Sequence, residues 1–213
     1  MNMFAKICKG IAIPLFKVLF PYQVVNKNCL PETGKFIVCS NHISMKDPIF
    51  IGMTQNRLPN FMAKEELFRN KFVAAVIRKL GAFPVYRGSG DAKAMETAFN
   101  ILKQGEVLGI FPEGTRSKDG NLLRPKPGIA IFAYQENAPI LPVAIVAHNG
   151  KVRLFHKTAI VYGEPILPEE LGITTGSGPE LRNASRLIMS RIAALREIGL
   201  KMIEQGKPVS QNS

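Results

Sequence analysis

The residues best suited to chemistry in this sequence are a histidine and an aspartate that follow an apolar segment. His42 is the first of three histidines, and Asp47 comes five positions later in NHISMKDPIF. Residues five apart on a regular helix differ by about 140° in direction, which would separate the two side chains. We expect Asp47 instead to cap a helix that has Pro48 in its first turn, with His42 in the turn before it. The carboxylate could then hydrogen-bond one imidazole nitrogen and leave the other to accept a proton, as in a general base.

A second polar cluster, FPEGTRSKDG (111–120), directly follows the apolar segment EVLGIF. Gly114 permits close approach of the backbone, Glu113 supplies a carboxylate, and Thr115 and Arg116 add hydrogen-bond donors. Backbone amides together with an arginine suit a phosphate or carboxylate. A plain polar turn remains the alternative here. For the first cluster the alternative is a capping aspartate beside a surface histidine, because that spacing is common by chance.

Further cations stand at the ends of other segments. Arg87 ends AFPVYR, and Lys126 precedes a helix whose start at Gly128 could bind an anion. Each is an ordinary surface charge when taken alone. Together with Arg116 they would form a group of cations on one face of a sheet.

Strand-like and helix-like segments alternate along the chain. The expected strands are 35–40, 60–64, 82–87, 106–111, 139–148 and 157–163. One helix is expected to start at Pro48, and four others are expected over 68–81, 90–105, 128–138 and about 178–205. This pattern predicts an α/β fold: a layered single domain with a mixed, largely parallel sheet flanked by helices. Ligands in such sheets bind in the loops after the strands, where both polar clusters lie.

Composition points to an anionic partner. The 213 residues carry a net charge of +12, which indicates nucleic acid, an acidic membrane surface or phosphorylated substrates. The N-terminal segment places Lys6, Lys9 and Lys17 within about 80° on one side of a helix and apolar residues on the other. It contains no run of roughly 20 apolar residues. We expect residues 1–22 to form an amphipathic helix that docks on an anionic membrane; packing on the protein's own core is the alternative.

Other classes of site and partner find less support in the sequence. Three cysteines form no disulfide framework, which suggests a reducing, cytosol-facing location. His148 and His156 have no partners at metal-ligand spacing, so no metal site is predicted. Neither an aromatic-rich strand motif nor a recognition-type helix supports nucleic acid as the partner.

Taken in order, these segments resemble the glycerolipid acyltransferase family, in particular its compact bacterial 1-acylglycerol-3-phosphate (lysophosphatidate) acyltransferases. The similar segments, between residues 41 and 145, are NHISMKD, AFPVYRG, FPEGTRS, KPGIA and LPVAI. The combination of H-x4-D with FPEGTRS is far more specific than either motif alone. The resemblance makes residues 23–213 the acyltransferase domain.

The resemblance implies transfer of a fatty acyl group from a thioester, acyl-CoA or acyl carrier protein, to lysophosphatidate, giving phosphatidate. It implies that His42 is the general base and that Asp47 orients it, with no acyl-enzyme intermediate and no cofactor besides the acyl donor. The residues implied in acceptor binding are Arg87, Glu113, Gly114, Thr115, Arg116 and Lys126. The oxyanion donors stay open between amides of the 111–117 loop and those of the 41–47 turn.

The resemblance also implies a peripheral enzyme on the cytoplasmic face of the cell membrane. Its partners would be the anionic membrane surface, the lysophospholipid acceptor and the acyl donor. The alternatives are a family member acting on glycerol-3-phosphate or another lysophospholipid, and a non-catalytic basic module that binds a membrane or nucleic acid. A salt-sensitive interaction without turnover would distinguish the last of these.

Overall fold

The computed structural model describes residues 14–85 and 92–205, which form a layered α/β domain. The strands of its sheet are β1 (Tyr22–Val25), β2 (Phe36–Ser40), β3 (Asn60–Lys64), β4 (Phe83–Val85), β5 (Val107–Ile110), β6 (Ile140–Ala147) and β7 (Thr158–Tyr162). Their order is β1-β7-β6-β2-β5-β3-β4. Only the β6–β7 pair is antiparallel among the paired strands, which confirms the predicted mixed, largely parallel sheet.

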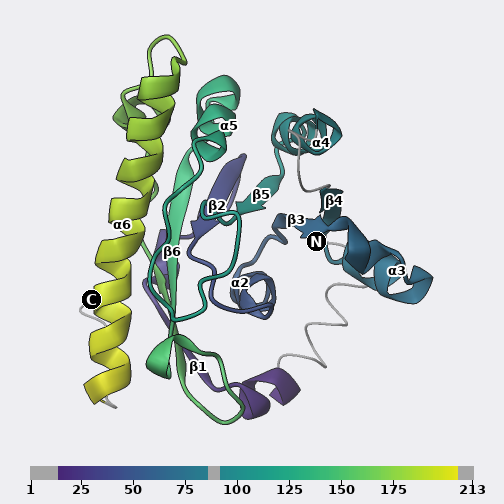
Figure 1. The fold of residues 1–213 in the computed structure, drawn as a ribbon, viewed down its shortest axis with the longest axis vertical. Coiled ribbons are helices and arrows are strands. Elements are labelled where there is room, and N and C mark those ends of the chain that lie inside the picture. Colours follow the sequence, from purple (N-terminus) through teal and green to yellow (C-terminus); the bar gives the residue numbers. More distant parts are fainter. Residues whose placement is uncertain (1–13, 86–91, 206–213) are drawn as a thin grey trace.

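Helices cover the sheet, and short 3-10 turns occur in several connections. The helices are α2 (Asp47–Thr54), α3 (Lys71–Lys79), α4 (Ala92–Lys103), α5 (Gly128–Glu136) and α6 (Gly178–Gln205). The 3-10 turns are η1 (Lys27–Cys29), η2 (Glu65–Phe68), η3 (His148–Gly150) and η4 (Pro168–Leu171). The long α6 runs alongside β6, and α3 projects on the opposite side of the molecule (Figure 1).

Each face of the sheet has its own apolar core, and β2 contributes to both. Ile37 and Cys39 belong to the core shared with α4, α5 and α6. Phe36 and Val38 belong to the core on the other face, which includes Phe50 and Ile51 of α2. Because both faces are covered, all five residues of β2 are buried, as is usual for central strands of parallel sheets. The end of β2 is therefore a rigid platform for the turn that follows it.

Three details depart from the sequence predictions. Residues 22–25 form the edge strand β1, which pairs in parallel with β7; no strand was expected there. The helix predicted over 68–81 begins at Lys71, because the Asn70 side chain accepts hydrogen bonds from the amides of Phe72 and Val73. In the N-terminal segment, 14–19 is helical, whereas 1–13 lies outside the described residues.

None of the helices described is both long and apolar enough to cross a membrane.

Candidate active site

His42 and Asp47 lie together at the carboxyl end of β2. The imidazole Nδ1 is 2.8 Å from Asp47 Oδ2, and the Asp47 side chain is fully buried. The backbone amides of Ile43 and Ser44 also donate to Oδ2, each over 2.7 Å. A carboxylate held by three donors has a fixed position, so it fixes the imidazole in turn. The remaining nitrogen, Nε2, can then accept a proton.

The prediction that Asp47 caps α2 is wrong in detail. Lys46 takes the cap position, and Asp47 is the first residue of the helix, with Pro48 next to it. The Asp47 carboxylate turns back to the preceding 42–44 turn instead of satisfying amides of its own helix. A negative side chain in the first turn of a helix is favourable. The geometric consequence that was predicted, a histidine outside the helix and within reach of the carboxylate, is present.

The 111–117 loop after β5 joins the same site. The amide of His42 donates to Glu113 Oε1 over 3.2 Å, and the amide of Ser117 donates to the His42 carbonyl over 2.7 Å. These two contacts tie the motif after β2 to the motif after β5, strands that are parallel neighbours. The two predicted clusters therefore form one site.

The carboxyl group of Glu113 has a raised pKa. It is 3 % exposed, and this burial raises its pKa to about 7. Hydrogen bonds from the amides of His42 and Leu123 lower the pKa and offset part of that rise, while the charge of Asp47 adds to it. Glu113 can thus be neutral or charged near neutral pH, and its place beside His42 is held in either state by the backbone amide.

The walls of the site are rigid. The His42 ring stacks on Phe111 with the ring centroids 4.0 Å apart, and Phe111 stacks on Phe61 of β3. Asn41, next to His42, is buried and exchanges two hydrogen bonds with the backbone of Ile145 in β6, at 2.9 and 2.8 Å. Asn41 thus ties the start of the His42 turn to β6.

Gly114 and Lys126 lie against each other. Gly114 has φ +65°, and a Cβ there would come within 2.8 Å of Lys126 Cε. The amide of Lys126 donates to the Pro112 carbonyl, which holds the lysine segment along the loop. Thr115 and Arg116 are exposed in the same loop. Five of the six predicted acceptor residues are therefore described, and four of them follow one another in this loop; Arg87 lies outside the described residues.

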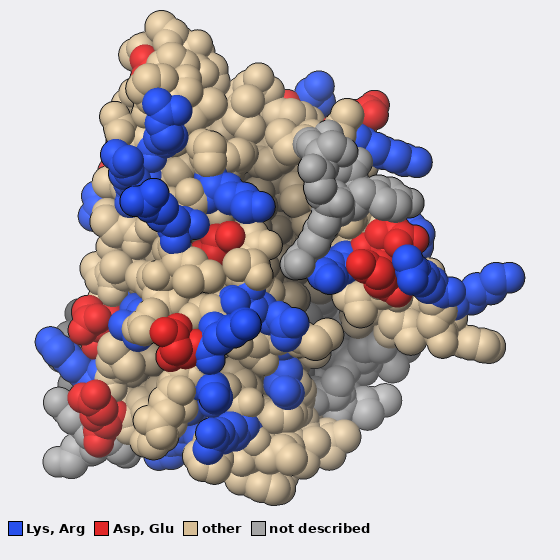
Figure 2. All heavy atoms as spheres, in the orientation of Figure 1, with Lys and Arg blue, Asp and Glu red and all other residues tan. Residues whose placement is uncertain are grey.

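A basic groove of about 380 Å³ opens beside the His42 turn. Four cations line it, together with Ile43, Ser44, Met45 and Val152: Lys46, Arg116, Lys151 and Arg153. Figure 2 shows Lys and Arg side chains gathered on this face over the start of α2 and the loop after β6. Three of the four were not predicted as site residues. For Lys151 and Arg153 the sequence signal was the KVR segment after the strand at 139–148, since β6 ends at the same sheet edge as β2; Lys46 adjoins Asp47.

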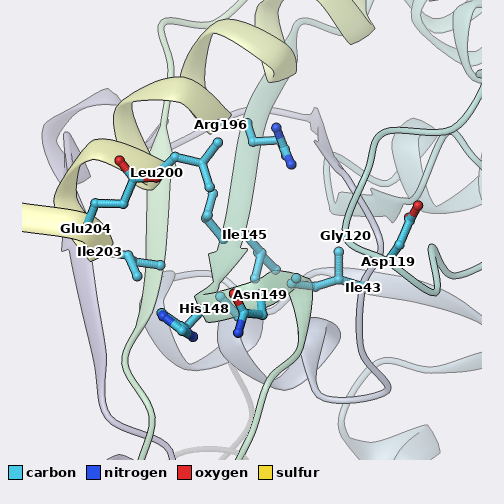
Figure 3. A pocket seen from close by; sticks show the side chains of 13 residues that line it. Ile43, Asp119, Gly120, Ile145, His148, Asn149, Arg196, Leu200, Ile203 and Glu204 are labelled. Atoms are coloured by element: carbon cyan, nitrogen blue, oxygen red, sulfur yellow. The ribbon is translucent and has the colours of Figure 1, made fainter.

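A second cavity, of about 260 Å³, also has Ile43 in its lining. Arg196, Leu200 and Glu204 line it from α6, with His148 and Asn149 from η3 and the 119–120 turn opposite (Figure 3). Neither His42 nor Asp47 lines it. Among the residues that the structure describes, no cluster of three or more His, Cys, Asp or Glu side chains could hold a metal ion.

Comparison with known proteins identifies the family. Residues 21–146 match the family model described as Acyltransferase, a region that contains the His42–Asp47 pair and the 111–117 loop. The chain belongs to the acyltransferase family. The resemblance seen in the sequence is thereby confirmed at the level of family and enzyme class.

Relatives of this acyltransferase include enzymes of several bacteria. A 1-acyl-sn-glycerol-3-phosphate acyltransferase of Bacillus subtilis is 32% identical over 166 residues, covering 76% of this chain and 81% of the relative. One from Borreliella burgdorferi is 32% identical over 141 residues, covering 65% of this chain and 56% of the relative. The crystal structure of a 1-acyl-sn-glycerophosphate acyltransferase from Thermotoga maritima matches with a TM-score of 0.71 and 26% identity, over 98% of this chain and 81% of that one.

Proposed function

We propose that this acyltransferase transfers a fatty acyl group from a thioester donor to the free hydroxyl of lysophosphatidate, giving phosphatidate. The observation that carries the proposal is the His42 Nδ1–Asp47 Oδ2 contact of 2.8 Å at the same sheet edge as the Glu113 loop. The relatives named for 1-acyl-sn-glycerol-3-phosphate support the choice of acceptor. The basic groove next to His42 supports a phosphorylated one.

In the proposed step, His42 Nε2 takes the proton of the acceptor hydroxyl as its oxygen attacks the thioester carbonyl carbon. Asp47 holds the imidazole with Nδ1–H directed at its carboxylate and stabilises the imidazolium that forms. The tetrahedral intermediate collapses with cleavage of the C–S bond. The thiol leaves with the proton that His42 returns, and an ester remains on the acceptor. The step as written needs no cofactor besides the thioester donor.

The charge on the intermediate's oxygen needs nearby donors, and the hydrogen bonds of the site narrow the choice. The amides of His42, Ile43 and Ser44 already donate to the carboxylates of Glu113 and Asp47. We therefore assign the oxyanion donors to the exposed part of the 111–117 loop, at Thr115 and Arg116. The Arg116 side chain faces the groove, so its cation is the proposed ligand for the acceptor phosphate.

Gly114 and Lys126 complete the proposed acceptor site. Because Gly114 lacks a Cβ, the Lys126 side chain can lie against the loop at Gly114. The neighbouring Glu113 cannot attract a phosphate while ionised, so its role is to hold the His42 backbone in place. Arg87 remains a proposed phosphate ligand from the sequence resemblance. The enzyme would act peripherally on the cytoplasmic face of the membrane, where its acceptor resides.

Assays of the purified protein with two donors and several acceptors test this proposal. Acyl-CoA and acyl carrier protein thioester would each be paired with lysophosphatidate, glycerol-3-phosphate and a lysolipid that lacks a phosphomonoester. We expect product only with lysophosphatidate, or far more of it. Preference for glycerol-3-phosphate would move the protein to another acceptor within the family, and no transfer to any acceptor would refute the proposal.

A further inference from the structure

Helix α3 carries a stripe of exposed apolar side chains, which no other element of the described residues 14–85 and 92–205 covers. Phe72, Val73, Val76 and Leu80 are exposed, Phe72 at 87 %. At 100° per residue these four side chains fall within about 100° of one another. The buried side of the helix is marked by Ala74, which lies outside that arc. Scattered exposed apolar residues are normal on a protein surface, but a stripe along one helix indicates a binding surface.

The helix is well anchored in spite of its exposed face. The Asn70 side chain caps its start, and the Arg78 guanidinium lies 4.8 Å from the Phe68 ring centroid in the preceding η2 turn. Phe72 is therefore presented on an ordered helix.

The charge of α3 is entirely positive. Its residues Lys71–Lys79 include three cations, Lys71, Arg78 and Lys79, and no acidic residue. Lys79 lies about 20° from Phe72 around the helix and so borders the stripe. Lys71 and Arg78 lie on the side of the helix away from the stripe. An apolar stripe bordered by a cation, with further cations on the polar side of the helix, is the pattern of helices that lie in the surface of an anionic bilayer. Two copies of this helix placed face to face would bring like charges together.

The position of α3 suits an enzyme whose reactants lie in a membrane. It follows β3, whose carboxyl end is at the same sheet edge as those of β2 and β5. The ring of Phe61 in β3 stacks on Phe111, which stacks on His42. The strand that precedes α3 and η2 thus ends at the same sheet edge as the candidate active site, and its Phe61 ring belongs to the stack beside His42.

We propose that α3 docks on anionic lipid, as a membrane contact separate from the N-terminal segment 1–22. Phe72, Val73, Val76 and Leu80 enter the boundary between headgroups and acyl chains, and Lys79, which borders them, reaches the lipid phosphates. Lys71 and Arg78 add positive charge on the polar side of the helix. The active-site edge then faces the bilayer; this orientation, unlike the docking itself, rests on the proposed function.

Vesicle sedimentation of the full chain tests the docking. The vesicles would contain phosphatidylcholine with or without phosphatidylglycerol, and the protein would be wild type or the double variant Phe72→Ser/Val76→Ser. We expect the partition coefficient on anionic vesicles to fall about tenfold or more in the variant, because two apolar side chains no longer enter the bilayer. Ile198→Ser is the matched control, since Ile198 is another exposed apolar residue on a helix, α6, and should bind as wild type.

Two further measurements keep the outcome decisive. Circular dichroism should show the same helix content in all variants. Acyl transfer between short-chain reactants dissolved as monomers should match that of the wild type, and its absence in the wild type would refute the proposed function without affecting the vesicle result. A change of less than twofold in partition for the double variant would overturn the α3 proposal. Loss of binding in Phe155→Ser alone would place the contact at the exposed 151–157 loop and overturn it too.

Discussion

Replacing Glu113 by glutamine should remove a specific pH dependence of stability. The carboxyl of Glu113 is buried beside His42, and burial raises its pKa from 4.5 to about 7. The folded protein therefore binds this proton more tightly than the unfolded chain does. The stabilisation is fully present below pH 4.5 and is lost as the pH rises through about 7.

The size of the effect follows from the two pKa values. Between pH 5 and pH 8 this one group should lower the free energy of unfolding by about 2 to 3 kcal/mol. In Glu113→Gln the side-chain oxygen can still accept the His42 amide hydrogen bond, so the fold should persist without that titration.

Urea denaturation of both proteins at several pH values measures this difference. The free energy of unfolding of Glu113→Gln minus that of the wild type should increase by about 2 to 3 kcal/mol from pH 5 to pH 8. Groups that titrate equally in both proteins cancel in the difference. A difference that stays constant over this range would show that Glu113 has an ordinary pKa and refute the reasoning.

Three other substitutions probe the site and its scaffold. Asp47→Asn should lower turnover about 10²- to 10⁴-fold with the fold retained, because the imidazole loses the carboxylate that orients it. Steady-state kinetics measures the turnover and circular dichroism checks the fold. Turnover within twofold of wild type would contradict this prediction. Arg116→Ala should raise KM for lysophosphatidate about tenfold. Lys118→Ala removes an exposed cation that follows the 111–117 loop and does not line the groove, and it should leave KM unchanged; equal effects would argue against a phosphate site at Arg116. Gly150→Ala should lower the free energy of unfolding by about 3 kcal/mol, because its Cβ would lie 2.3 Å from a backbone oxygen. Gly105→Ala, also at positive φ but in open space, should cost about 1 kcal/mol; urea denaturation compares the two, and similar losses would contradict the close contact.

Elements with strong local signals were predictable from the sequence. The buried run that forms β2 and the Asp-Pro pair that opens α2 both gave the correct structure within one or two residues. The same signals placed His42 in a turn at a strand end. The meeting of His42 with Glu113 followed only from the expectation that parallel strands end at one edge, which β2 and β5 do.

Features set by contacts between distant residues were not predictable. The edge strand β1 pairs with β7, near the other end of the chain, and no local alternation marked it as a strand. The Asp47 carboxylate accepts hydrogen bonds from amides of the 42–44 turn and not from those of its own helix, because the fold places the turn amides beside it. Lys151 and Arg153 reach the groove because β6 carries their loop to the same edge as β2.

The turnover of His42→Ala measures the role of the histidine most directly. Acyl transfer from a thioester to lysophosphatidate should fall at least about 10²-fold, because a general base contributes about 10²- to 10⁴-fold. His156→Ala, which removes an exposed histidine from the 151–157 loop, is the control and should keep wild-type turnover. A folded His42→Ala protein with wild-type turnover would contradict the assignment of His42 as the base.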